Sequence, residues 1–252
     1  MARFADAFAL VTGAAGGIGR AAARAFAAEG ARVVVADVDD AGGAETVRLI
    51  TEAGGEAVFE RCDVSDPAAV AGLVDGAVAR WGRLDAAVNN AGVGGVRAPT
   101  AAYPDDDWAR TLAVNAGGVF YGTKHALRHM VPAGRGSVVN VASVAGLSGF
   151  PGSVAYCASK HAAVGVTRAA ALEVARSGVT VNAVCPSFTE TAMVESLRTF
   201  DPALGDKLVA RTPVGRLGTV AEVAAAILYL CGPDARFLTG LALPLDGGMT
   251  AG

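Results

Sequence analysis

Apolar and polar positions divide the chain into short, β-branched runs separated by longer, alanine-rich helical stretches. Several of the short runs are apolar almost without interruption, which is typical of strands covered on both faces. The predicted strands are Ala7–Thr12, Arg32–Ala36, Ala57–Cys62, Ala86–Asn89, Ser137–Ala142, Val179–Cys185 and Ala242–Leu245. The predicted helices are Gly17–Glu29, Asp40–Ala53, Pro67–Trp81, Asp105–Met130, Val154–Arg176 and Val220–Leu230.

The alternation of strand and helix predicts right-handed crossovers and therefore a parallel sheet. We expect an α/β fold in which helices sandwich a doubly wound parallel β-sheet. No change of composition marks a boundary, so residues 1–252 are expected to form a single domain. The segment at about 187–218 lacks a clear strand and follows a strand end, which favours a substrate lid over a surface insertion.

Composition excludes several classes of protein. Hydrophobic residues make up 52% of the chain and charged residues 18%, which excludes disorder. The net charge is −3 and the basic residues form no stripe, so nucleic-acid binding is not expected. The sequence contains no apolar stretch of about 18 residues, so no membrane span is expected. The four cysteines form no CxxC pair and only three histidines accompany them, so we expect no metal site and a reducing, cytoplasmic location.

A glycine-rich turn joins the first predicted strand to the first predicted helix. Its candidate binding residues are Gly13, Gly16, Gly17, Ile18 and Gly19. Glycines allow a tight turn there, and the free N–H groups of the helix N-terminus attract an anion such as a pyrophosphate. The placement between strand and helix predicts a dinucleotide site rather than an ordinary turn.

Asp37 ends the second predicted strand, 18 residues after Gly19. A carboxylate at this place can accept hydrogen bonds from both hydroxyls of an adenosine ribose and repels a 2′-phosphate. Neither Gly16 nor Val38 supplies a cation that would attract that phosphate. We therefore expect NAD, with NADP less favoured. The alternative is that Asp37 only caps the next helix.

From end to end, the sequence resembles the short-chain dehydrogenase/reductase family, a group of NAD(P)-binding oxidoreductases with a Rossmann-like fold. The resemblance rests on several independent motifs. They are TGxxxGxG at Thr12–Gly19, Asp63-Val64, NNAG at Asn89–Gly92, Asn115, Ser143, YxxxK at Tyr156–Lys160, and DGG at Asp246–Gly248. It implies that Asn115, Ser143, Tyr156 and Lys160 are catalytic, with Asn115 holding a water in a proton relay from Lys160 to solvent.

The resemblance also extends the expected cofactor site. Besides the turn and Asp37, that site comprises Val38, Asp63, Val64, Asn90, Ala91, Gly92, Tyr156, Lys160, Pro186, Thr189 and Thr191. The chain departs from the family pattern after the sixth strand, where Ser187 replaces a glycine and Thr189 an aliphatic residue. We expect cofactor binding to persist, although a glycine here often serves a positive φ.

The spacing of Tyr156 and Lys160 gives the catalytic prediction a physical basis. Residues four apart on a helix lie on one face, so the ammonium is expected to lower the tyrosine pKa from its usual value near ~10. Tyr156 would then act as general acid and base. Ser143 would hydrogen-bond the substrate oxygen as charge shifts onto it.

The predicted substrate pocket has few charges. Its candidate residues are Ser143, Ala145, Phe150, Tyr156, Phe188 and Met193. An apolar lining favours a hydrophobic or weakly polar secondary alcohol, or its ketone, over a sugar phosphate or a carboxylic acid.

Two other functions remain open at this point. One is an NADPH-dependent 3-oxoacyl-carrier-protein reductase, which Asp37 disfavours and which Arg128 and His129 keep open. The other is a non-catalytic NAD(H) sensor, which has no chemical need for the complete catalytic set. The resemblance further suggests a homotetramer built on the segments Asp105–Met130 and Val154–Arg176 and on the C-terminal segment.

Overall fold

The computed structural model describes residues 2–191 and 204–251. Within them, one seven-stranded sheet has the order β3-β2-β1-β4-β5-β6-β7, and all neighbouring strands are parallel. The strands are β1 Phe8–Thr12, β2 Arg32–Asp37, β3 Glu56–Arg61, β4 Ala86–Asn89, β5 Gly136–Val141, β6 Val179–Pro186 and β7 Ala242–Leu245. The helices are α1 Gly17–Ala28, α2 Asp40–Glu52, α3 Pro67–Trp81, α4 Asp105–Leu112, α5 Gly118–Ala133, α6 Val154–Val174, α8 Leu204–Ala210 and α9 Val220–Cys231.

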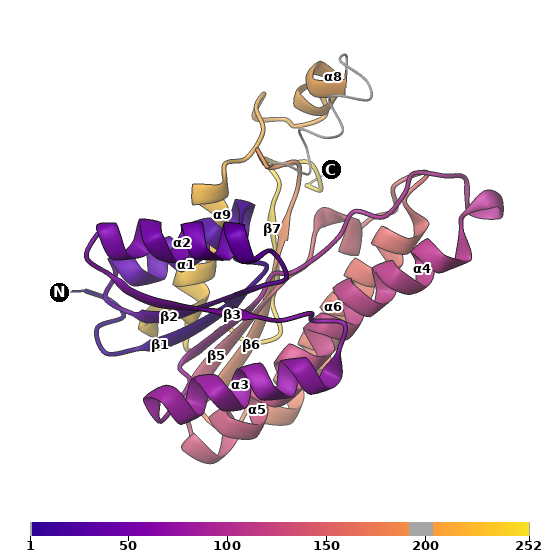
Figure 1. The fold of residues 1–252 in the computed structure, drawn as a ribbon. Coiled ribbons are helices and arrows are strands. Elements are labelled where there is room, and N and C mark those ends of the chain that lie inside the picture. The colour runs from indigo at the N-terminus through magenta and orange to yellow at the C-terminus, as the bar shows by residue number, and fades with distance from the viewer. Residues whose placement is uncertain (1, 192–203, 252) are drawn as a thin grey trace.

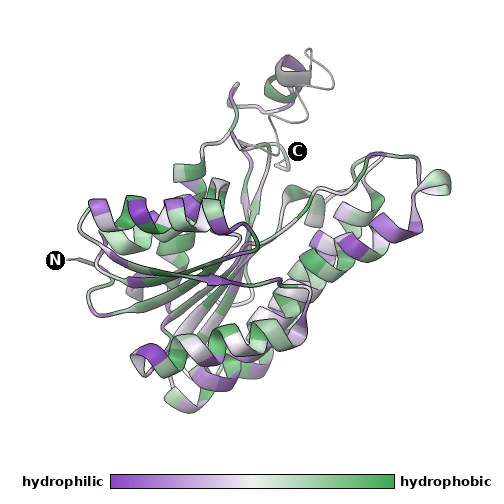
Figure 2. Cartoon of the chain, in the orientation of Figure 1, coloured by the Kyte–Doolittle hydropathy of each residue, from purple (hydrophilic) through white to green (hydrophobic). Residues whose placement is uncertain are grey.

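Helices cover both faces of the sheet, which confirms the predicted doubly wound fold. Figure 1 shows α1, α2 and α9 on one face and α3, α5 and α6 on the other. Neighbouring residues of β1 serve opposite cores, because Val11 packs with Phe26 and Ile227 whereas Leu10 packs with Val74. Figure 2 shows the result as hydrophobic strands between helices whose polar residues face outward. No helix of the described segments is long and apolar enough to cross a membrane.

The predicted helix Asp105–Met130 is corrected by the structure. A π-helical turn at Ala113–Gly117 separates α4 from α5, and α5 continues to Ala133. Asn115 lies inside that turn, and its side chain bonds to the backbone of Val93 instead of facing solvent. Periodicity could not reveal the extra residue of the turn, since apolar spacing continues across it.

The segment that follows β6 contains a helix that the sequence did not predict. Figure 1 shows α8 beyond the carboxyl edge of the sheet, near β7. Leu208 and Leu217 are buried against Phe188 and Val209, and Gly218 is bonded to the backbone of Phe188 and Glu190. The two described parts of this segment, 187–191 and 204–218, therefore contact each other. Its action as a lid stays a prediction.

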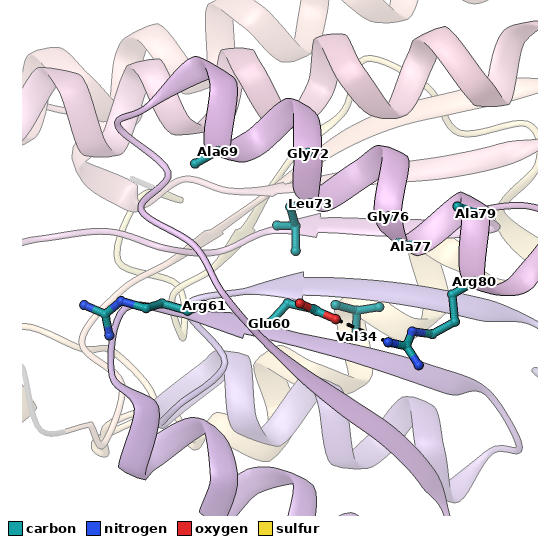
Figure 3. Close-up of a pocket in the computed structure, with 10 residues that line it drawn as sticks. All are labelled: Val34, Glu60, Arg61, Ala69, Gly72, Leu73, Gly76, Ala77, Ala79 and Arg80. Atoms are coloured by element: carbon teal, nitrogen blue, oxygen red, sulfur yellow. Dashed lines mark ion pairs between the residues drawn. The ribbon is translucent and has the colours of Figure 1, made fainter.

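Two helical glycines should respond oppositely to alanine. A Cβ on Gly122 in α5 would lie 1.9 Å from Asn89 Oδ1, next to the buried bond from Asn89 Nδ2 to Asn140 Oδ1. A Cβ on Gly72 would meet nothing within 4 Å, because it faces a cavity of about 590 Å³ between α3 and β3 (Figure 3). We expect Gly122→Ala to lower the free energy of unfolding by about 1–3 kcal/mol, and Gly72→Ala to raise it by about 0.5–1 kcal/mol. Urea denaturation measures both, and equal effects would contradict this packing.

Candidate active site

The glycine-rich turn closes tightly against the loop that follows β4. Gly13 has φ of +64°, and a Cβ there would lie 2.7 Å from the Cα of Ala91. A Cβ on Gly19 would lie 2.1 Å from the carbonyl oxygen of Gly13. Both positions therefore require glycine, and the predicted turn residues come together with Asn90 and Ala91.

Thr12 and Asn90 hold this turn in place. Asn90 Nδ2 donates to the carbonyl oxygens of Thr12 at 2.9 Å and Gly13 at 3.0 Å. Thr12 Oγ1 accepts from the N–H groups of Asn90 and Ala91. Thr12 was not among the predicted site residues, although it opens the glycine motif; its hydroxyl is what joins the ends of β1 and β4.

The carboxylate of Asp37 accepts a hydrogen bond from the backbone of the same turn. Its Oδ2 accepts from the N–H of Ala15 at 2.9 Å, and its Oδ1 accepts from the N–H groups of Val38 and Asp39. The cap of α2 is Asp39, which accepts from the N–H of Gly42. Capping is therefore not the role of Asp37. Its carboxylate lies beside the turn, where the dinucleotide hypothesis requires an acceptor.

Arg20 and Thr46 donate hydrogen bonds to backbone carbonyl oxygens of the turn. Neither residue was among the predicted site residues. Thr46 Oγ1 donates to the carbonyl oxygen of Ala14 at 2.8 Å, and Arg20 donates to the carbonyl oxygen of Ala15 and to Thr46 Oγ1. These bonds orient the backbone of the turn. The bonds that the Arg20 guanidinium makes in the described segments go to these neutral oxygens and to the carbonyl oxygen of Gly42, and none goes to Asp37.

The observed residues fit a dinucleotide. No side chain caps the N-terminus of α1, and a Cβ on Gly16 would meet nothing within 4 Å, so this end of α1 is open to an anion. Asp37 retains lone pairs for ribose hydroxyls. Asp63 is exposed, and its pKa is lowered by the side-chain and backbone hydrogen bonds from Ser65. The binding residues themselves stay a prediction.

Not every predicted cofactor residue offers its side chain. Val64 is buried in one core, so its backbone is what remains for a ligand, whereas Ile18 is only partly buried against the other core. Val38 is exposed. A Cβ on Gly17 would lie 3.7 Å from Thr191 Cγ2, so the segment after β6 reaches the glycine-rich turn. Pro186 ends β6, and Thr189 forms an isolated bridge with Gly218.

Ser143, Tyr156 and Lys160 come together at the carboxyl ends of β5 and β6. The Ser143 hydroxyl donates to the carbonyl oxygen of Pro186 at 3.4 Å and accepts from the N–H of Ala145, and it lies close enough to Tyr156 to act on the tyrosine pKa. Lys160 Nζ lies 5.6 Å from the centroid of the Tyr156 ring. Gly92 adjoins this group, because a Cβ there would lie 3.5 Å from Lys160 Nζ.

The electrostatics differ from the sequence expectation. Burial raises the pKa of Tyr156, and the hydrogen bond with Ser143 acts in the opposite direction. Burial also lowers the pKa of Lys160 to about 8. The Tyr156 pKa is therefore raised and not lowered as expected from Lys160, because loss of solvent disfavours phenolate and ammonium alike.

Asn115 connects the loop after β4 to the helix that carries Tyr156. Its Oδ1 accepts from the N–H of Val93 at 2.8 Å, and its Nδ2 donates to the carbonyl oxygen of Val93 and to Ser159 Oγ. Ser159 Oγ in turn donates to the carbonyl oxygen of Tyr156 at 2.8 Å. Asn115 thus positions α6, and Ser159 is a supporting residue that the YxxxK motif contains but does not mark.

Two aromatic rings lie together at the predicted substrate pocket. The rings of Phe150 and Phe188 meet edge-on with centroids 6.3 Å apart, and the N–H of Phe150 donates to Cys157 Sγ beside Tyr156. Ala145 is buried next to Ser143. Ser187 has no positive φ, since Asp6 is the only non-glycine residue with one in the described segments, so its side chain causes no backbone strain. Met193 lies outside the described residues.

Burial of the charged Lys160 side chain should lower the free energy of unfolding of the protein. It is 4% exposed, and its Nζ donates to the carbonyl oxygen of Val141 at 2.8 Å. Because its pKa is lowered to about 8, the folded state binds the proton less tightly than the unfolded state. Lys160→Met should raise the free energy of unfolding at pH 7 by roughly 1–3 kcal/mol, after the lost hydrogen bond is allowed for.

This gain should shrink between about pH 8 and 10.5, where Lys160 of the wild type loses its proton on folding. Urea denaturation at pH 7 and at alkaline pH measures it. Lys124→Met is the matched control because Lys124 is exposed on α5. A gain that is independent of pH, or that is shared by the control, would contradict the prediction.

Comparison with known proteins supports the resemblance. A family model described as Enoyl-(Acyl carrier protein) reductase matches residues 13–250. Cis-4-hydroxycyclohexanecarboxylate dehydrogenase of Sinomonas cyclohexanicum is 43% identical over 249 residues, which cover 98% of both chains.

Two solved structures share the fold and hold different cofactors. NAD+-bound xylitol dehydrogenase has a TM-score of 0.93 at 35% identity and is matched over 98% of this chain and 100% of its own. A variant of actinorhodin polyketide ketoreductase with NADPH has a TM-score of 0.93 at 42% identity, over 96% and 97%. With a matching family model and relatives aligned over nearly their whole length, this chain belongs to the short-chain dehydrogenase/reductase family of oxidoreductases.

Proposed function

We propose that this protein is an NAD-dependent oxidoreductase that interconverts a hydrophobic or weakly polar secondary alcohol and its ketone. The observation that carries this proposal is the grouping of Ser143, Tyr156 and Lys160 at the carboxyl ends of β5 and β6, next to the rings of Phe150 and Phe188. A relative that acts on hydroxycyclohexanecarboxylate supports an alicyclic alcohol as one substrate type.

Each residue of the site has a distinct task in this reaction. The nicotinamide ring, when bound, accepts or supplies the hydride. Ser143 donates a hydrogen bond to the substrate oxygen, and Tyr156 removes the hydroxyl proton in oxidation or returns it in ketone reduction. Lys160 places a positive charge under the tyrosine ring as the phenolate forms. The rings of Phe150 and Phe188 exclude water from the reacting carbon.

A second candidate is an NADPH-dependent 3-oxoacyl-carrier-protein reductase. The ketoreductase that holds NADPH is 42% identical, and the matching family model is described as an acyl-carrier-protein reductase. Asp37 opposes this candidate because a 2′-phosphate would meet its carboxylate. Activity confined to NADPH and acyl thioester ketones would favour it.

We also propose a homotetramer in the cytoplasm. Phe120 on α5 and Leu172 on α6 are exposed apolar residues on the two helices expected to form the interface, and Phe237 is fully exposed near the C-terminal segment. The four cysteines are unpaired, which suits a reducing compartment.

Removal of the Tyr156 hydroxyl tests the proposed chemistry. Tyr156→Phe keeps the ring but cannot transfer the proton, so NAD-dependent oxidation should fall by about 10²–10⁴-fold in kcat. The measurement is initial rates with alicyclic, aryl, diol, sugar and steroid alcohols. NADH binding, followed by fluorescence, should persist. Full turnover in the variant would refute the assignment. Tight NADH binding by the wild type without turnover of any alcohol would favour the sensor.

Asp37 tests the cofactor preference. Asp37→Asn keeps an acceptor for the N–H of Ala15 but removes the charge that a 2′-phosphate would meet. Two like charges about 4 Å apart repel by about 1–4 kcal/mol. Removal of this repulsion should lower the ratio of kcat/KM for NAD to kcat/KM for NADP by about tenfold or more. Asp39→Asn removes the same charge two residues away and retains the cap of α2. The hypothesis fails if Asp39→Asn shifts the ratio as far as Asp37→Asn.

A further inference from the structure

Arg211 is the one residue that brings a positive charge to the aromatic wall of the substrate site in the described part of the chain. Its guanidinium carbon lies 5.7 Å from the centroid of the Phe150 ring. Phe150 contacts Phe188 edge-on, and its N–H is bonded to Cys157 beside Tyr156. The cation therefore lies against an aromatic ring whose own backbone is bonded beside Tyr156.

Two hydrogen bonds to α8 fix the backbone at Arg211 and Thr212. Its N–H donates to the carbonyl oxygen of Lys207, which extends the last turn of α8. The next residue, Thr212, is 4% exposed, and its hydroxyl donates to the carbonyl oxygen of Leu208 at 3.0 Å. Leu208 is buried against Phe188. The backbone of Arg211 is thus anchored to the same aromatic residue that walls the site.

The charge of Arg211 is not neutralised by a neighbour in residues 2–191 and 204–251. No carboxylate there forms an ion pair with it, whereas Arg216 forms one with Glu222 at 2.6 Å. Arg211 is exposed, and stacking on Phe150 leaves the N–H groups at the edge of its guanidinium available. Two such N–H groups match the two oxygens of a carboxylate.

We propose that Arg211 binds a carboxylate of the substrate, so that the natural substrate is a hydroxy or oxo acid. Its apolar body, such as an alicyclic ring, would lie along Phe150, with the alcohol or ketone at Tyr156 and the acid at Arg211. This inference rests on the proposed function and deepens it. It also revises the sequence expectation of an uncharged substrate, which considered the apolar residues but not the cation beside Phe150.

The test compares 4-hydroxycyclohexanecarboxylate with its neutral carboxamide as substrates of the full-length protein with NAD. The wild type should prefer the acid. Arg211→Gln should lower kcat/KM for the acid about 10- to 100-fold, mainly through KM, because a hydrogen bond to a charged group is lost. It should lower kcat/KM for the carboxamide far less, because a hydrogen bond to a neutral oxygen is worth less than one to a carboxylate, and Arg211→Lys should retain part of the preference.

Arg176→Gln is the matched control, because it removes the same charge from an exposed position just past the distal end of α6. If the acid and the carboxamide lose equally in Arg211→Gln, or if Arg176→Gln reproduces the loss, the assignment of Arg211 is overturned while alcohol oxidation stands. If the wild type oxidises the carboxamide but does not prefer the acid, the inference is likewise overturned. If neither compound nor any other secondary alcohol is oxidised, the proposed function itself fails.

Discussion

Burial of both faces of a parallel sheet is the constraint on which the rest of the structure depends. Side chains of β1 are shared between two cores, so Leu10 and Val11 are both committed to packing. Chemistry is therefore left to the carboxyl ends of the strands, where the chain leaves the sheet. Thr12 and Ser143 lie at two of these ends, and their hydroxyls bond across to neighbouring strand ends. One sheet edge thus assembles residues that are far apart in the sequence.

Much of this arrangement could be predicted from the sequence, and the exceptions have physical causes. Uninterrupted apolar runs identified the strands, and motif spacing identified Tyr156 and Lys160. The π-helical turn around Asn115 was missed because apolar periodicity does not register a single added residue. Arg20 and Thr46 were missed because they act on backbone carbonyls, which impose no sequence pattern. The helix α8 was missed because its seven residues are too few to show a repeat.

The electrostatics of the site follow from the same burial. Desolvation opposes the charged forms of both Tyr156 and Lys160, so it raises the pKa of the tyrosine and lowers the pKa of the lysine to about 8. Ser143 provides the compensating hydrogen bond, and Val141 provides an acceptor for the lysine. In the proposed reaction, proton transfer would therefore take place in a setting that stabilises neither charge strongly. Local stability is lower as a result, which is a common property of catalytic centres.

The small hydrophobic cluster of Leu208, Leu217, Phe188 and Val209 is separate from the two large cores. Evolution can therefore exchange these side chains with little effect on the sheet or on the helix that carries Tyr156 and Lys160. If the proposed substrate site is right, a duplicated gene would acquire a new substrate by mutation in this cluster while the proposed cofactor site stayed intact. The names of the relatives, from a hydroxycyclohexanecarboxylate dehydrogenase to a polyketide ketoreductase, are those expected of such a modular scaffold.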